Sequence, residues 1–365
     1  MTILHIIGNR PQLIKLAPFL GAMRRYPKVK NIILHSGQHY DYEMSKIFFQ
    51  ELGIPDADYN LDIGSGTHGF QTGSILVKLD PILMDVKPDM VIVYGDTNTT
   101  LAGALGAHKL HLPLAHVESG VREYVWRPEE INRKIADHCS DFCLCPIPKA
   151  CANLEKEGIE RGRIFHTGDI TYDVFLMSTP IAEDKGEIRP PREDYVLMTM
   201  HRAETVDIYD KVNGVIEALR SIPYPIVYPI HPRTKKMLTE FGLYDKLEAS
   251  GRVRLIPPVG YFDFLKLLLH CRIVITDSGG VIKEAFYARK FCVTLDSSTE
   301  YKEELFDPGY NVLAGTERDR VMDAALRMLE KSSRPMTISD NPFGDGRAGE
   351  KMAGVIMDRL EGRSE

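Results

Sequence analysis

The chain has 365 residues, 44% of them hydrophobic, and its 45 basic and 51 acidic side chains give a formal net charge of −6. This length exceeds one ordinary hydrophobic core and favours two domains. The balanced charge argues against nucleic acid as a partner, because nucleic-acid-binding domains carry a concentrated basic surface. The first apolar run, Ile3 to Ile7, is soon followed by Arg10 and Lys15, so it is too short for a signal sequence or a membrane span. We therefore expect a cytoplasmic location.

Short runs rich in Ile and Val alternate with helical patterns along the whole chain. This alternation is typical of an α/β fold with parallel sheets and crossover helices. In the first half, strands are expected at residues 3–7, 31–36, 90–94, 113–117 and 142–145. In the second half, they are expected at residues 195–199, 225–229, 253–256, 272–276 and 291–295.

The domain boundaries follow from composition. Residues 178–194 contain three prolines and mixed charge without apolar periodicity, which indicates a linker between a domain at 1–177 and a domain at 195–345. The segment 346–365 has apolar residues at helical spacing and predicts a terminal helix that packs back on the N-terminal domain. These apolar residues are Met352, Val355, Ile356 and Leu360.

Four of the six cysteines lie between residues 139 and 151, and thiolates at short spacing can bind zinc. The segment DFCLCP alternates as a strand does, however, and this places Cys143 and Cys145 on one face. We therefore expect small buried apolar side chains rather than a metal site.

Polar residues follow directly after many of the predicted strands. Ligands of open parallel sheets bind beyond the carboxyl ends of the strands, so these residues in both halves suggest a cleft between two domains. They are Arg10, Asp96, Glu118, His201, His231 and the turn Ser278-Gly279-Gly280.

The segment VITDSGGVIKEAF predicts a strand, a glycine turn and a helix start. Free amides and the helix dipole favour an anion there, most simply a phosphate, and Glu284 could accept hydrogen bonds from two ribose hydroxyls. The alternative is an ordinary helix start capped by Ser278. The spacing differs from the P-loop and the dinucleotide fingerprint, so ATP and NAD are not favoured.

The segment IIGNRPQLIK has the same strand, turn and helix order. Arg10 could grip a diphosphate with two hydrogen bonds and Lys15 could act as a point charge, or both could simply be solvated at a helix start. His201 is followed at once by Arg202, and this pair is expected to face a charged ligand.

Asp96 and Glu118 each follow a predicted strand of the first half. A carboxylate in this place can cap a helix, and Asp96 before TNTTLAG fits that role. With Glu129 from the PEE segment, the two could instead form the set of carboxylates that proton transfer needs, with environments that separate their pKa values.

Taken in order, these motifs resemble those of the non-hydrolysing UDP-N-acetylglucosamine 2-epimerase family over nearly the whole chain. The motifs are GNRPQLIK, GQHYD, YGDTNTTLAGALGA, HVESGVRE, RPEEINR, HRAET, HPRT and TDSGGVIKEA. The resemblance implies a glycosyltransferase-B-like fold of two Rossmann-like domains with the nucleotide sugar in the central cleft. It also implies an isomerase without NAD, metal or other cofactor, usually a homodimer, that interconverts UDP-N-acetylglucosamine and UDP-N-acetylmannosamine for cell-surface polysaccharide biosynthesis.

Matched by position, the resemblance implies two sets of site residues. The catalytic set is Asp96, Glu118, Glu129 and His201. The set implied for UDP is Arg10, Arg202, Ser278, Gly279, Gly280 and Glu284, with Phe264 near the uracil. Lys15 and His231, named above from their own sequence positions, complete the expected binding set for UDP and sugar.

The chemistry accounts for these residue types. The hydrogen on sugar carbon 2 is not next to a carbonyl, so it becomes acidic only when the bond from carbon 1 to UDP breaks. Cationic and amide donors would stabilise departing UDP, and carboxylates would take the proton and support the positive carbon 1. Elimination to 2-acetamidoglucal and re-addition with protonation from the other face would give the epimer.

Several positions depart from the commonest pattern of the family, among them Ile282, where Gln is usual. Gln12 replaces a usual Glu and is similar to the branch that acts on UDP-2,3-diacetamido-2,3-dideoxyglucuronate, Lys283 lies where Glu is usual, and Asp296 where Arg is usual. The segment GQHYDYEMSK also lacks the Arg and Gln of the bacterial activator site, so no activation is expected. The alternatives are an epimerase for the diacetamido sugar, a hydrolysing epimerase, a glycosyltransferase and a non-catalytic nucleotide-sugar sensor.

Overall fold

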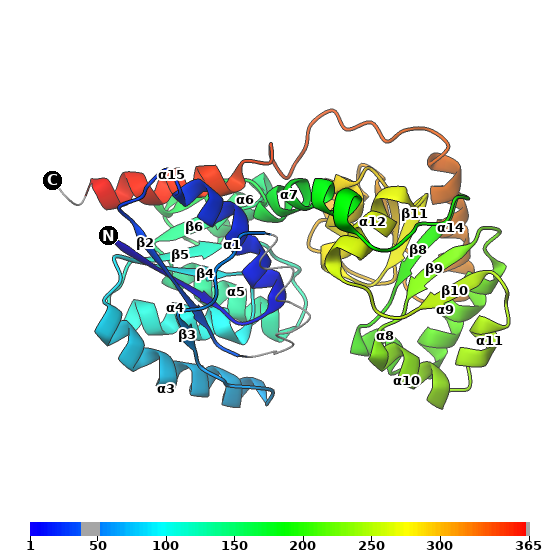
Figure 1. Ribbon diagram of the computed structural model, residues 1–365, viewed down its shortest axis with the longest axis horizontal. Coiled ribbons are helices and arrows are strands. Elements are labelled where there is room, and N and C mark those ends of the chain that lie inside the picture. The colour runs from blue at the N-terminus through cyan, green and yellow to red at the C-terminus, as the bar shows by residue number, and fades with distance from the viewer. Residues whose placement is uncertain (38–51, 363–365) are drawn as a thin grey trace. The chain divides into compact units, whose positions relative to one another are not determined.

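A computed structural model describes residues 1–37 and 52–362. The chain forms two compact units, Met1–Met177 together with Asp340–Glu365, and Ser178–Ser339 (Figure 1). Among the described residues, no helix combines the length and the apolar character that a membrane crossing requires.

The first unit is built on a seven-stranded sheet with the order β3-β2-β1-β4-β5-β6-β7, in which every neighbouring pair is parallel. Its direction of winding reverses between β1 and β4, as in doubly wound folds, and ligands bind at such a switch point. The strands are β1 (Thr2–Ile7), β2 (Lys30–His35), β3 (Tyr59–Asn60), β4 (Met90–Tyr94), β5 (Leu114–Val117), β6 (Phe142–Cys145) and β7 (Ile164–His166).

Local signals start the helices of this unit. Asn9 accepts a hydrogen bond from the Gln12 amide at the start of α1, and Thr97 forms a capping box with Thr100 at the start of α4. The elements are α1 (Arg10–Met23), α3 (His68–Val86), α4 (Asn98–Lys109), α5 (Pro128–Cys139), α6 (Pro148–Lys156), η1 (Arg161–Arg163), α7 (Ile170–Lys185) and α15 (Ala348–Glu361).

The second unit repeats the architecture with a six-stranded parallel sheet in the order β10-β9-β8-β11-β12-β13. Its strands are β8 (Val196–Thr199), β9 (Ile226–Pro229), β10 (Val253–Ile256), β11 (Ile273–Thr276), β12 (Phe291–Thr294) and β13 (Asn311–Leu313). Its other elements are α8 (Ala203–Val206), α9 (Tyr209–Ser221), α10 (Pro232–Glu240), α11 (Tyr244–Glu248), α12 (Tyr261–His270), α13 (Gly279–Tyr287), η2 (Lys302–Phe306) and α14 (Arg318–Lys331).

Helix α15, from the C-terminal end of the chain, packs against α1 in the first unit (Figure 1). A Cβ atom on Gly349 would lie 2.7 Å from the backbone carbon and oxygen of Pro18, so the two helices approach closely at this glycine. The amides of Ala348 and Gly349 donate to the two oxygens of Asp173, at 3.0 and 2.8 Å. This carboxylate therefore holds the first turn of α15.

All ten predicted strands are present, and their ends differ from the prediction by at most one residue. The α/β fold class is thus confirmed. Residues 178–185, placed by the sequence in a linker, instead form the end of α7, where Ser178 and Ala182 are buried on one face around Pro180. The chain also returns to the first unit at Asp340 rather than at 346.

The cysteines of DFCLCP lie on β6, as expected. Cys143 and Cys145 are fully buried, and burial raises the pKa of the Cys143 thiol to about 12. Neutral buried thiols of this kind behave as small apolar side chains.

Candidate active site

Two adjacent turns of the first unit carry Asp96 and Glu118. The strands before them are paired with Tyr94 opposite Val117, so the turns lie side by side at the carboxyl edge of the sheet. Gly95 has φ +63° and Glu118 has φ +69°, the left-handed region that non-glycine residues rarely adopt. A strained Glu118 persists only because its surroundings hold it, and such strain is concentrated at functional sites.

Glu118 forms an ion pair with Lys15 of α1. A Cβ atom on Gly95 would lie 3.4 Å from Glu118 Oε2 and 3.7 Å from Lys15 Nζ. Both charged side chains are mostly buried, so the pair fills the space directly above Gly95. Lys15 is therefore not merely solvated at a helix start.

Asp96 is held by α5. Arg133 donates to Asp96 Oδ2 from Nε at 3.0 Å and from Nη2 at 2.5 Å, and Asn132 Nδ2 donates to the Asp96 carbonyl at 2.9 Å. Burial opposes ionisation of Asp96, but Arg133 and then Lys15 hold its pKa below the ordinary value. Thr97 caps α4, so the interpretation of Asp96 as the cap is wrong.

The two glutamates at the start of α5 have different surroundings. Glu129 is exposed in the first turn, whereas Glu130 is buried and accepts a hydrogen bond from the Glu123 amide at 3.2 Å. Glu130 also lies 3.6 Å from Arg133 Nη1, and so forms part of the support beneath Asp96.

Gln12 is buried, and its side chain joins the turns after β1 and β4. Its Oε1 accepts from the Gly8 amide at 2.7 Å, and its Nε2 lies 2.6 Å from the Tyr94 carbonyl. Thr97 and Thr100 hydroxyls lie 2.9 and 3.0 Å from the same nitrogen. The polar atoms of the Gln12 side chain are therefore all bonded within the protein, where they stabilise the two turns. Arg10 is the first residue of α1, but its side chain lies outside the described part of the structure, as does most of the segment GQHYDYEMSK.

In the second unit, Asp277 organises the turn that carries His201. His201 Nδ1 lies 3.2 Å from Asp277 Oδ1, and the amides of His201 and Arg202 each donate to Asp277 Oδ2 at 2.8 Å. Asp277 is fully buried while the His201 side chain is 45% exposed. The imidazole is thus oriented by a buried carboxylate and open to a ligand.

His231 lies beside His201, with 5.9 Å between the ring centroids. Its Nδ1 accepts from the Arg233 amide at 3.2 Å and caps α10. Burial, and then the neighbouring His201 and Arg233, lower the pKa of His231. This favours a neutral imidazole next to His201.

The turn Ser278-Gly279-Gly280 opens α13, and the Ser278 side chain accepts from the Val281 amide at 3.5 Å. A Cβ atom on Gly279 would lie 3.6 Å from Glu300 Oε1 and 3.7 Å from Arg202 Nη2. Arg202 therefore reaches the start of this helix. Glu284 is buried on α13, and Phe264 is half-buried on α12.

Arg202 already has an anionic partner. Its Nη1 lies 2.5 Å from Asp296 Oδ2, and Asp296 Oδ1 accepts from the Ser297 amide at 2.7 Å. The carboxylate at position 296 is thus bound to the same guanidinium that the sequence assigns to UDP. A diphosphate at this place would compete with Asp296.

The structure brings Lys15, Asp96 and Glu118 together in the first unit, and His201, His231, Arg202 and the α13 start in the second. Sequence reasoning missed the partners Arg133 and Asp277, and it named Asp296 without its pairing to Arg202. A signal existed for Asp277, since it directly follows β11 in the TDSGG turn.

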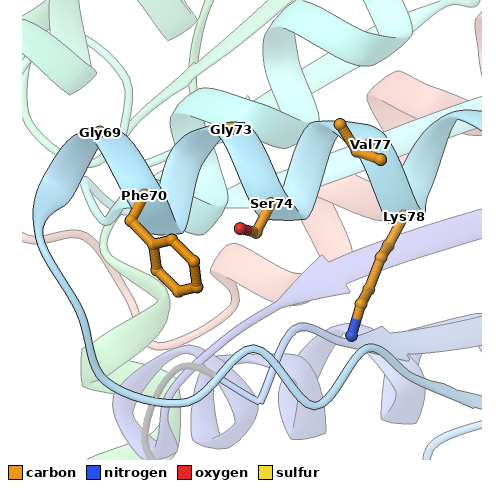
Figure 2. A pocket seen from close by; sticks show the side chains of 6 residues that line it. All are labelled: Gly69, Phe70, Gly73, Ser74, Val77 and Lys78. Atoms are coloured by element: carbon orange, nitrogen blue, oxygen red, sulfur yellow. The ribbon is translucent and has the colours of Figure 1, made fainter.

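A separate hollow of about 390 Å³ lies along α3, and none of the predicted site residues lines it. Figure 2 shows Phe70, Ser74 and Lys78 projecting from the same side of this helix. Lys78 Nζ is used within the fold, where it donates to the Leu61 carbonyl at 2.5 Å.

Two doubly wound parallel sheets with polar groups after their strands define an α/β enzyme of the glycosyltransferase-B-like fold. The sequence profile described as UDP-N-acetylglucosamine 2-epimerase matches residues 21–357. The chain therefore belongs to the UDP-N-acetylglucosamine 2-epimerase family.

Several relatives match along nearly their whole length. The UDP-N-acetylglucosamine 2-epimerase of Methanocaldococcus jannaschii is 42% identical, with 96% of this chain and 97% of the relative covered. The UDP-2,3-diacetamido-2,3-dideoxy-D-glucuronate 2-epimerase of Pseudomonas aeruginosa is 44% identical over 97% and 98% of the two chains. The crystal structure of the M. jannaschii enzyme in complex with UDP-GlcNAc and UDP has a TM-score of 0.89 at 41% identity, and covers 98% of this chain and 100% of that one.

Proposed function

We propose that this protein interconverts UDP-N-acetylglucosamine and UDP-N-acetylmannosamine as a non-hydrolysing 2-epimerase. The observation that carries the proposal is the likeness, over nearly the whole chain, to a solved epimerase with UDP-GlcNAc and UDP bound. The adjacent turns with Asp96 and Glu118 support it, because simple binding of a nucleotide sugar has no use for a set of carboxylates.

UDP is held mainly by the second unit in this proposal. The amides at the start of α13 and the Arg202 guanidinium bind the diphosphate, together with Arg10 and Lys15. Glu284 accepts hydrogen bonds from the ribose hydroxyls and Phe264 lies near the uracil. His201 and His231 face the departing phosphate oxygen and the sugar.

The reaction has two steps. One carboxylate of the set Asp96, Glu118 and Glu129 takes the proton from sugar carbon 2, and the bond from carbon 1 to UDP breaks with its electron pair leaving on UDP. In the second step a UDP oxygen re-forms the bond to carbon 1 of 2-acetamidoglucal, and a proton reaches carbon 2 from the opposite face. Cations around the diphosphate stabilise the charge that develops on UDP.

Incubation with UDP-N-acetylglucosamine in heavy water tests the mechanism. Proton NMR and mass spectrometry should show deuterium at carbon 2 of both epimers, with no free sugar. Free N-acetylmannosamine would indicate a hydrolysing epimerase. Binding of the nucleotide sugar without exchange at carbon 2 would indicate a sensor, and either result would refute the proposal.

The diacetamido uronic acid nucleotide is the second candidate substrate, because the P. aeruginosa relative is 44% identical. The same NMR assay with both nucleotide sugars side by side decides between them. Gln12 does not separate the candidates by direct contact with a sugar, since its side chain is buried and bonded within the fold.

Substitution of the carboxylates tests the residue assignment. Asp96→Asn, Glu118→Gln and Glu129→Gln are each expected to lower turnover by about 10²- to 10⁴-fold while UDP still binds. Glu160→Gln, an exposed residue between α6 and η1, is the control and should keep turnover. Near-normal turnover of all three variants would show that these carboxylates are only structural.

The proposal includes a cytoplasmic homodimer. All six cysteines are unpaired, which suits a reducing compartment. Twofold dimers are the commonest assembly of soluble enzymes, and light scattering with size-exclusion chromatography measures the state directly.

A further inference from the structure

Behind the turns of Asp96 and Glu118 lies a mostly buried group of polar side chains, which we call the His116 cluster. We infer that His116 donates from both ring nitrogens and is a positioning residue for these two turns; its positioning role rests on the proposed function. The cluster consists of His116, Ser119, Arg122, Asp137 and Glu157.

The hydrogen bonds of His116 require a proton on Nε2. This nitrogen lies 2.7 Å from the Gly95 carbonyl oxygen, which can only accept. The other nitrogen, Nδ1, lies 2.7 Å from Asp137 Oδ1. Nδ1 therefore also carries a proton if Asp137 is a carboxylate.

Asp137 has the surroundings of a carboxylate. Its Oδ1 also accepts from the Ser119 hydroxyl, and its Oδ2 accepts from the Gly120 amide at 3.2 Å and from Arg122 Nη2 at 2.7 Å. The donors Ser119, Gly120 and Arg122 all stabilise the charged form of Asp137, independently of His116. Both ring nitrogens of His116 therefore act as donors.

The charges of the cluster are balanced, as buried charges must be. Arg122 also donates to Glu157 from Nε at 2.9 Å and from Nη2 at 2.6 Å. The cluster thus holds two cations and two anions. The side chains of His116, Asp137 and Arg122 are fully buried.

The cluster forms hydrogen bonds with residues of both turns of the site. His116 Nε2 holds the carbonyl of Gly95, directly before Asp96, while Asp137 binds the Ser119 hydroxyl and the Gly120 amide, directly after Glu118. These contacts explain how Glu118 is kept at φ +69°. The positive charge on His116 also contributes to the lowered pKa of Asp96.

His5 on β1 provides a matched contrast in the same sheet. It is also fully buried, but its Nδ1 lies 2.9 Å from the Tyr94 hydroxyl, which can donate, and its Nε2 lies 3.0 Å from Asn31 Oδ1. These partners suit a neutral ring. Burial lowers the pKa of His5 to about 4, against a smaller opposing effect of Asn31.

Nitrogen-15 NMR of the full-length protein labelled at histidine tests the protonation. Both His116 nitrogens should carry a proton, whereas His5 should show one unprotonated nitrogen. The His116 resonances are assigned by their loss in His116→Gln. If His116→Gln does not fold, the change in their chemical shifts in Ser119→Ala assigns them instead. An unprotonated nitrogen on His116 would overturn the inference.

Kinetics test the positioning role. His116→Gln should lower kcat on the order of 10²-fold, with UDP affinity within about twofold, because small displacements of reacting groups cost this much. His5→Gln is the control for loss of a buried histidine and should keep kcat. Ser119→Ala keeps the ion pairs and should lower kcat less, and unchanged kcat in both His116→Gln and Ser119→Ala would refute positioning. A wild-type protein without epimerase activity would contradict the proposed function, but it would leave the NMR result on His116 intact.

Discussion

Asp296 is a single residue that places a negative charge beside Arg202 in the second unit. Its carboxylate is paired with Arg202 at 2.5 Å and lies close to the start of α13. An anionic ligand must therefore displace the Asp296 carboxylate before it can form all its hydrogen bonds with the Arg202 guanidinium. Ion pairs that must break on binding reduce the net gain in affinity.

Replacement of this carboxylate should strengthen nucleotide binding. Asp296→Asn is expected to lower the Kd for UDP by about 3- to 10-fold, near 1 kcal/mol for a partly exposed ion pair. Isothermal titration calorimetry at fixed ionic strength measures it. Asp194→Asn, which removes the partner of Arg272 at 2.5 Å, is the control for loss of one charge and should leave Kd unchanged. Weaker binding by Asp296→Asn would mean that the carboxylate prepares Arg202 for the ligand.

His5 makes stability depend on pH. Its pKa is about 4 in the folded protein, from burial first, against 6.5 as the ordinary value, so the folded state disfavours the charged ring. This contribution is complete above the unfolded value and is lost as the pH falls through the folded value. Between about pH 7 and about pH 4 the free energy of unfolding should fall by about 3 kcal/mol from this group.

Urea unfolding at a series of pH values measures the effect of His5. His5→Gln should show a correspondingly flatter pH profile, even though it lowers stability near neutral pH. Parallel profiles for the two proteins would contradict the assignment of this pH dependence to His5.

At the scale of elements, two glycines of α15 test how closely this helix packs. A Cβ atom on Gly349 would meet the backbone of Pro18 at 2.7 Å, whereas one on Gly354 would meet nothing within 4 Å. Gly349→Ala should therefore lower the free energy of unfolding by about 1–3 kcal/mol. Gly354→Ala should raise it by about 0.5–1 kcal/mol, because alanine favours a helix more than glycine does.

Circular dichroism during urea unfolding distinguishes the two variants. Equal effects of both substitutions would show that helix propensity decides stability here and that the contact of α15 with α1 does not.

The sequence predicted the elements that have a strong apolar signal. Runs such as Met90 to Tyr94 are buried along their whole length, since both faces of a parallel sheet are covered. The strands β3, β7 and β13 were missed because they have only two or three residues at or near the sheet edges, and those residues are partly polar. The end of α7 was missed because of Pro180. A proline inside a helix is rare, so its presence in the sequence indicates a break in the helix.

The strand ends also led to the candidate site, since a strand assignment places the next residue at the carboxyl edge. This located Asp96, Glu118 and His201. The partner of Asp96 could not be predicted, because Arg133 reaches this residue only through the return of α5 to the sheet. Pairing of this kind depends on tertiary packing and leaves no pattern in the local sequence.

At the scale of the whole molecule, the first unit depends on a helix supplied by the end of the chain. Helix α15 buries several apolar side chains, among them Met352, Ile356 and Leu360. Each fully buried side chain of this size contributes about 1.5–3 kcal/mol, so their sum is comparable with the entire stability of a domain.

A chain that ends at Arg347 should therefore lose the stable fold of the first unit. The unit Ser178–Ser339 contains its own sheet and should still show a thermal shift with UDP. Hydrogen exchange with mass spectrometry would locate the loss of protection to residues 1–177. A chain that ends at Gly362 retains the whole of α15 and is the control, and equal protection in both chains would contradict this dependence.

The same arrangement sets the order of events during biosynthesis. Residues 1–177 leave the ribosome first, yet the helix that covers α1 emerges only after the entire second unit has been made. Domains usually complete folding in the order of synthesis. Here the second unit can finish first, and synthesis of α15 becomes the step that allows the first unit, with its carboxylates, to reach its final structure.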